Sequence, residues 1–172
     1  MVLSIAFLGA IVAGCYGIVH DHVTYSISPE YFTKVKFQQF RYADFRIGDR
    51  AFVSSIGFLA TWWVGFAIAW FLARRLIPNQ PRTVAYRQIA MGFALVLACG
   101  MLSAAAGFSY GLWRGPAADY SSWAGIVARH QVTDIYAFVR VAYIHNASYL
   151  GGLLGVILAL IIIRPQHHPK SP

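Results

Sequence analysis

Long apolar runs alternate with short polar connections along this chain, and the pattern predicts four membrane-spanning helices. Each run holds few or no charged residues, and a helix needs about 20 such residues to cross the hydrocarbon core of a bilayer. The predicted spans cover residues 2–20, 51–73, 84–112 and 134–163. The sequence therefore predicts an all-α fold, an integral membrane four-helix transmembrane bundle.

The first connection is the longest polar segment and predicts one further helix. Ser28 is a good N-cap, Pro29 suits the first helical position, and the Glu30 carboxylate is favoured in the first turn of a helix. Aromatic residues and lysines mix over the following positions, a composition typical of a helix that lies in the membrane interface. We expect an additional amphipathic interface helix over residues 29–42.

The spans form one transmembrane domain, residues 1–164, followed by a disordered tail, residues 165–172. An alternative exists for the first run, because the residues VAGC, which end at Cys15, match a bacterial lipobox, where a signal sequence is cleaved and the cysteine is lipidated. No lysine or arginine precedes the run, whereas a secretory signal normally opens with positive charge. A retained spanning helix is therefore favoured.

Composition and charge agree with a membrane protein. The chain is 58% hydrophobic and 12% charged, with a formal net charge of +8, whereas soluble domains carry roughly 25% charged residues. The basic residues are spread over connections and helix ends and form no compact stripe, so no nucleic-acid partner is expected. We expect the protein to lie in a lipid bilayer, and to bind a membrane-protein partner or form a homo-oligomer there.

The distribution of charge also predicts an orientation. Four spans place the first and third connections on one side, and all acidic residues of the chain fall there: Asp21, Glu30, Asp44, Asp49, Asp119 and Asp134. The opposite side is dense in arginine over a very short connection, which favours the cytoplasm. We expect a multi-pass protein of the bacterial inner membrane, with both termini cytoplasmic and a polar periplasmic face.

Two histidines are predicted to lie at the same depth. His20 follows Met1 by nineteen residues and His145 precedes Arg164 by nineteen, which is about 28 Å along a helix in each case. Tyr16 and Tyr149 lie four residues deeper on the same helix faces as His20 and His145, respectively. If the first and last helices are neighbours, two Tyr-His pairs face a common pocket.

Other polar residues on this side complete the candidate site. They are Asp21, His22, Glu30, His130 and Asp134. Imidazoles with carboxylates suit a transition metal, and two opposed histidines can ligate haem iron. The metal ligands expected from the sequence are His20, His22 and His145. The competing interpretation makes His20 and His145 interfacial polar groups that bond to the tyrosines or to backbone.

The segment HDHVTYSISPEYF resembles an H-D-x-[VI]-T-x-x-[IL]-S-P-E-Y-F pattern of small uncharacterised bacterial membrane proteins, in which it stands near the end of a first apolar helix. The resemblance covers thirteen residues. It implies a similar four-helix membrane protein and points to His20, Asp21, Thr24, Ser28, Pro29 and Glu30. It implies no activity.

Two function hypotheses follow from the sequence. No serine-histidine-acid spacing, phosphate-binding glycine loop or other catalytic signature is present. The leading hypothesis is therefore an accessory or interaction protein whose first connection docks a partner or lipid at the periplasmic face. The alternative is a metal- or haem-binding redox or catalytic protein that uses the boundary histidines. A transporter or channel is less favoured, because no charge interrupts the first three spans near mid-membrane.

Overall fold

The computed structural model describes residues 1–163, and the predicted disordered tail, residues 165–172, lies outside this part. Every regular element in the described part is helical. The long helices are α1 (Val2–Ile27), α4 (Asp49–Leu76), α5 (Arg82–Arg114) and α7 (Ile135–Ile162). The short ones are α2 (Pro29–Tyr31), α3 (Phe37–Gln39) and α6 (Ala124–His130). Short 3-10 turns occupy Arg41–Ala43, Ile77–Asn79 and Ser121–Trp123.

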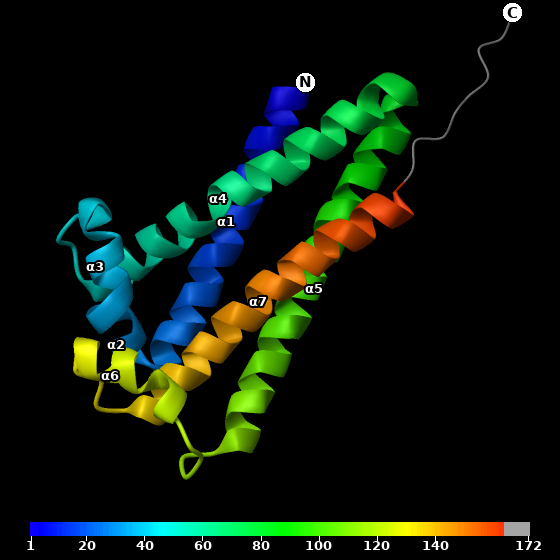
Figure 1. The fold of residues 1–172 in the computed structure, drawn as a ribbon. Coiled ribbons are helices and arrows are strands. Elements are labelled where there is room, and N and C mark those ends of the chain that lie inside the picture. Colours follow the sequence, from blue (N-terminus) through cyan, green and yellow to red (C-terminus); the bar gives the residue numbers. More distant parts are fainter. Residues whose placement is uncertain (164–172) are drawn as a thin grey trace, which may run out of the picture.

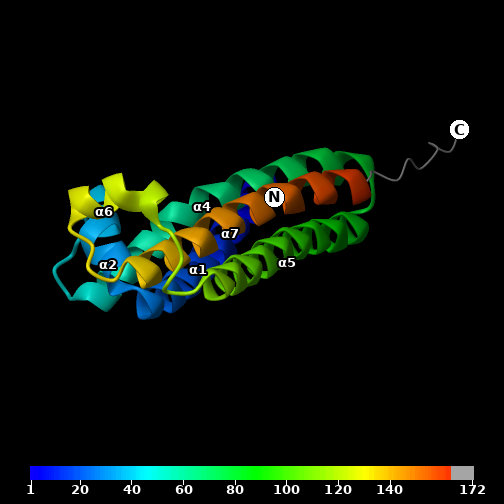
Figure 2. The same ribbon diagram turned by 60° about the horizontal axis from the view of Figure 1, so that its bottom comes forward.

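The long helices form two hairpins that lean against each other. Helix α1 packs mainly on α4 and α5 mainly on α7, whereas α4 meets α5 and α1 meets α7 over shorter stretches. Figures 1 and 2 show the two pairs from different sides. Each hairpin is closed by a long connection, residues 28–48 or 115–134, whereas the short connection between α4 and α5 joins the two hairpins. Helices α1 and α7 come together near the end that carries α2, α3 and α6.

Glycines let the helices of each hairpin approach closely. A Cβ atom on Gly17 would overlap the carbonyl oxygen of Gly57, and one on Gly57 would overlap the backbone of Gly17. This pair lies on the α1–α4 interface, where the two backbones nearly touch. Small residues serve this purpose in membranes, because the lipid provides no hydrophobic drive and association depends on close van der Waals packing.

Helix α1 is longer than the sequence predicted. The first span was expected to end at residue 20, but α1 continues to Ile27. Two hydroxyl side chains in the added turns bond back to the helix: Thr24 Oγ1 donates to the His20 carbonyl, and Ser26 Oγ donates to the His22 carbonyl. Polar residues therefore extend the helix instead of ending it. The other spans agree with prediction to within three residues.

The predicted interface helix, residues 29–42, begins at Pro29 but is less regular than expected. It comprises α2, a π-helical turn (Phe32–Lys36) and α3, and it ends at Gln39. Ser28 occupies the N-cap position, yet its side chain makes no capping bond and its Oγ is buried without a partner. We call residues 29–39 the cover helix, because it closes one end of the two hairpins.

Apolar contacts hold the cover helix against both hairpins. On one side, Phe37 and Phe40 pack against the start of α4 around Phe52. On the other, Tyr31 and Val35 pack against the start of α7. Its aromatic side chains thus face protein, and Phe32 is 0% exposed.

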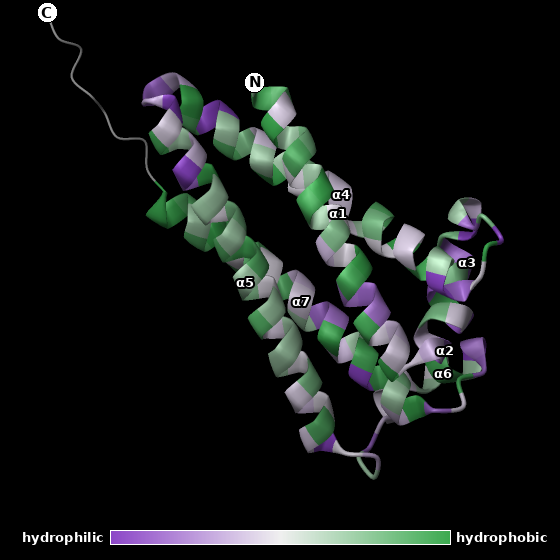
Figure 3. Cartoon of the chain, turned by 180° about the vertical axis from the view of Figure 1, so that it is seen from behind, coloured by the Kyte–Doolittle hydropathy of each residue, from purple (hydrophilic) through white to green (hydrophobic). Residues whose placement is uncertain are grey.

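The surface of the four long helices is apolar along most of their length. Figure 3, coloured by hydropathy, shows mostly hydrophobic residues along these helices, with hydrophilic residues concentrated toward the two ends of the molecule. All four long helices in the described part are long and apolar enough to cross a membrane. The expected all-helical fold is confirmed, together with four helices of membrane-spanning length.

Candidate functional site

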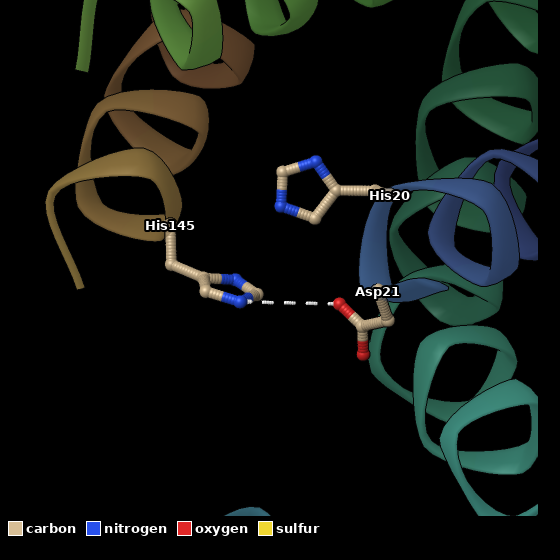
Figure 4. Close-up of side chains that lie close together, drawn as sticks. All are labelled: His20, Asp21 and His145. Carbon is tan, nitrogen blue, oxygen red and sulfur yellow. Dashed lines mark ion pairs between the residues drawn. The ribbon is translucent and has the colours of Figure 1, made fainter. Parts of the chain in front are cut away.

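Two histidines and an aspartate come together where α1 passes α7. His20 and Asp21 lie on α1, and His145 faces them from α7 (Figure 4). Each residue offers one metal-ligating atom, and these atoms all lie within 4.8 Å of one another. The rings of His20 and His145 meet edge to face with centroids 4.9 Å apart. Oδ1 of Asp21 lies 4.0 Å from Nε2 of His145. We call these three residues the His/Asp cluster.

Two residues of the cluster are buried and His20 is partly buried, yet each has a buried polar atom that lacks a partner. His145 is 2% exposed and Asp21 is 4% exposed. Nε2 of His20, Oδ2 of Asp21 and Nε2 of His145 have no hydrogen-bond partner. An unsatisfied buried polar atom costs about 1–3 kcal/mol, so three such atoms on neighbouring side chains favour a shared partner. A cation among them would accept a lone pair from each residue.

The spacing suits a single metal ion better than haem. A first-row ion binds histidine nitrogen and carboxylate oxygen at about 2.0–2.2 Å, so two ligands of one ion lie at most about 4.4 Å apart. A pair separated by as much as 4.8 Å needs side-chain shifts of about 1 Å to reach a common ion. The two imidazole rings touch each other, which leaves no space between them for the plane of a porphyrin.

The cover helix places aromatic rings over His145. Tyr31 stacks on the His145 imidazole, with centroids 5.1 Å apart and planes 10° apart, and the Phe32 ring lies 6.3 Å from it. Burial raises the pKa of the Tyr31 phenol, and the nearby Tyr149 and Asp21 raise it further. Tyr31 therefore stays protonated and uncharged beside the cluster.

The π-helical turn brings a positive charge to the same place. Lys36 follows Tyr31 by five residues and is 8% exposed, and its charge acts on His20, Asp21 and His145. Residues five apart diverge on an α-helix of 3.6 residues per turn, whereas i→i+5 bonding in a π-helix aligns them more closely. Bulges of this type occur frequently at functional sites.

The two predicted Tyr-His pairs are present and have different surroundings. The Tyr16 ring lies 5.7 Å from that of His20, and its hydroxyl is 3.2 Å from Ser148 Oγ on α7. The Tyr149 ring lies 6.0 Å from that of His145 but is 58% exposed. Tyr16 therefore ties the two hairpins together one turn below the cluster, and Tyr149 lies at its outer side.

The structure separates His22 and His130 from the cluster. Nε2 of His22 lies 2.8 Å from Ser54 Oγ on α4, and Arg50 bonds to the same histidine. Nδ1 of His130 lies 3.0 Å from the carbonyl oxygen of Lys34, which accepts a hydrogen bond from it. Asp21, and not His22, thus joins His20 and His145.

Glu30 and Asp134 meet at the start of α7 instead of at the cluster. The Glu30 carboxylate accepts bonds from the backbone N–H groups of Thr133 and Asp134 and from the Thr133 hydroxyl. Asp134 in turn accepts a bond from the backbone N–H of Ala137 and caps α7. Glu30 therefore fastens the cover helix to α7 and keeps Tyr31 above His145.

The Glu30 carboxyl is adapted to this role. Partial burial acts to raise its pKa, but the bonds from Asp134 and Thr133 and the charge of Lys34 together outweigh burial and lower the pKa below its ordinary value. The charged form is thus the one that binds α7. The contact also puts a negative charge at a helix N-terminus, where the helix dipole favours it.

Replacing Glu30 by glutamine is expected to lower the free energy of unfolding by about 1 kcal/mol at pH 7, because an amide is a weaker acceptor for these donors. A carboxyl whose pKa is lowered by folding contributes fully to the free energy of unfolding above its ordinary pKa of 4.5. This contribution is lost as the pH falls through the lower pKa of the folded state. The difference between wild type and E30Q should therefore shrink as the pH falls below about 4.5. Thermal unfolding in detergent, followed by circular dichroism across this range, measures it.

Asp44→Asn is the matched control. The Asp44 carboxylate accepts only a local bond from the Arg46 backbone in an exposed connection, so its loss should change stability by less than about 0.5 kcal/mol. Equal stability of E30Q and wild type at pH 7, or a difference that grows in acid, would contradict the role given to Glu30.

No family model, curated protein or solved structure matches this chain. The function is therefore inferred from the geometry of the site itself. The strongest part of that geometry is the His/Asp cluster, in which buried ligand atoms from two hairpins converge. The cover helix, fastened by Glu30, closes the cluster from one end.

Proposed function

We propose that this protein is a multi-pass metal-binding protein of the bacterial inner membrane, with a divalent transition-metal ion held by His20, Asp21 and His145. The observation that carries the proposal is the convergence of three ligand residues, two buried and one partly buried, each with a buried polar atom that has no partner. This observation favours metal binding over the accessory-protein hypothesis, which has no comparable support.

The ligand set indicates which ions fit. Two histidines and one carboxylate are the ligands of many catalytic zinc sites and of non-haem iron sites, and both leave coordination positions open for water or substrate. A divalent ion with a single carboxylate ligand keeps a positive charge, and Lys36 adds another. An anion in the open position would neutralise this buried charge, which is otherwise costly. We therefore expect Zn²⁺ or Fe²⁺ with an anionic or ionisable further ligand.

The charge distribution supports the orientation. Arg74, Arg75, Arg82 and Arg87 lie around the short α4–α5 connection, and the acidic residues lie in the other two connections or in the helix ends beside them. The positive-inside tendency puts the arginine-rich end in the cytoplasm. The His/Asp cluster then lies near the periplasmic boundary, with the cover helix between it and the aqueous phase.

Elemental analysis of protein purified in detergent without chelator tests the function. We expect about one equivalent of zinc or iron per chain. After removal of metal, titration with Zn²⁺, and with Fe²⁺ under nitrogen, should restore one equivalent with micromolar or tighter affinity. A metal-free preparation that binds neither ion below about 100 µM would refute the proposal. His20, Asp21 and His145 would then form only a polar contact between hairpins.

A further inference from the structure

A second feature lies at the other end of the molecule, between the two hairpins. A cavity of about 710 Å³ opens between α1 and α5, and Ala69 of α4 also lines it. Its lining is almost wholly apolar and includes Leu8, Val12, Ala69, Ala90, Phe93 and Leu97. We call this cavity the hairpin groove. The His/Asp cluster contributes no residue to it, so the groove is independent of the proposed metal site.

The length of the groove matches one leaflet of a bilayer. On α5 the lining runs from Tyr86 to Leu97, which is about 16 Å along a helix. Half of a hydrocarbon core of about 30 Å is about 15 Å. An acyl chain that enters at the Tyr86 end therefore remains beside the groove for the whole depth of its leaflet.

The mouth of the groove is positively charged. Arg82 lies four residues before Tyr86, on the same face of α5, and Arg87 follows Tyr86 directly; both arginines are exposed. The acidic residues of the chain all lie toward the opposite end, in the connections there or in the helix ends beside them. Juxtamembrane arginines attract anionic lipid headgroups by about 1 kcal/mol each, and Tyr86 adds a hydroxyl at the same level.

We propose that the hairpin groove binds one acyl chain of an anionic phospholipid, with the phosphate held at Arg82 and Arg87. A second copy of the chain fits less well: two copies inserted in the same direction would bring their arginine-rich ends together at one depth, where like charges repel. The proposal rests on the membrane insertion proposed above and is independent of the metal.

Native mass spectrometry of detergent-purified protein tests the site with dioleoyl phosphatidylglycerol and dioleoyl phosphatidylcholine as probes. Wild type is expected to retain one phosphatidylglycerol and to bind phosphatidylcholine about tenfold more weakly, in line with two arginine contacts. R82Q/R87Q should remove this preference while leaving weak binding of both lipids. Ala94→Trp, which fills the groove, should weaken phosphatidylglycerol binding about tenfold or more.

Ala98→Trp is the matched control, because Ala98 is exposed on the next turn of α5 and does not line the groove. It should bind phosphatidylglycerol as wild type does, and thermal unfolding should show that both tryptophan variants are folded. Equal affinity for the two lipids in wild type, or unchanged binding in A94W, would overturn the proposal and leave only unspecific surrounding lipid. A dimer that A94W dissociates would overturn it in favour of a second copy. Metal content is measured separately and reports only on the His/Asp cluster. The lipid proposal and the metal proposal can therefore fail independently of each other.

Discussion

His145→Phe is expected to abolish high-affinity metal binding while leaving the metal-free protein within about 1 kcal/mol of wild-type stability. A phenyl ring keeps the stack on Tyr31 but removes a buried nitrogen that has no partner. Changes outside the ligand shell already reduce metal affinity 10–100-fold, so losing one of three ligands should reduce it more than about 100-fold. Zn²⁺ titration and unfolding in the presence of chelator give the two numbers separately.

His22→Phe is the matched control for this prediction. His22 lies two residues from His20 on the same helix but contacts Ser54 on α4, so its replacement should change Zn²⁺ affinity less than about threefold, because it touches no ligand. A metal-free H145F protein destabilised by about 3 kcal/mol or more would show that His145 makes a structural bond. Unchanged Zn²⁺ affinity in H145F would refute the ligand set.

The sequence located two of the three cluster residues by depth alone. His20 and His145 were placed at one level by counting along two helices, and their rings are in contact. The count succeeded because helical rise is nearly constant and both spans are unbroken. Their adjacency required knowledge of which helices are neighbours, which depends on packing between segments more than a hundred residues apart.

The sequence places Asp21 in the candidate polar site but predicts His22, not Asp21, as the third metal ligand, and it predicts that the first span ends at residue 20. A residue that follows the end of a helix has no defined face. Once α1 continues to Ile27, His20 and His22 lie about 200° apart around the helix and cannot both face α7. A signal was available: Gly9, Ala13, Gly17 and Asp21 repeat at four-residue spacing, which extends the buried stripe to the aspartate.

The contact between Glu30 and the start of α7 could not be predicted from the sequence. Glu30 has all the features of a first-turn carboxylate on its own helix, and the sequence favours that local role. In the structure it bonds to the N–H groups of Thr133 and Asp134, which begin another helix. Local chemistry predicts the preference of a carboxylate for a helix N-terminus, whereas the fold determines which helix it serves.

Gly151→Leu is expected to have the largest effect on the fold. A Cβ atom at Gly151 would overlap Ser103 and the carbonyl oxygen of Cys99 on α5, so a leucine must push α5 and α7 apart. Overpacking typically costs 1–3 kcal/mol and more where backbone is involved, so we expect a loss of about 3 kcal/mol. Because α7 also carries His145, the shift should lower Zn²⁺ affinity by about tenfold or more, a loss that chemical denaturation and metal titration measure together.

Gly152→Leu is the control that shares composition, helix and depth. A Cβ atom at Gly152 has no atom within 4 Å, so the leucine points into open space and gains about 0.8 kcal/mol in helix propensity. It should leave both stability and Zn²⁺ affinity at or slightly above wild type. Equal destabilisation by the two variants would mean that α5 and α7 do not pack through Gly151. A destabilised G151L that retains full Zn²⁺ affinity would instead show that the His/Asp cluster tolerates movement of α7. We do not expect this outcome, because the ligands of the cluster are closely spaced.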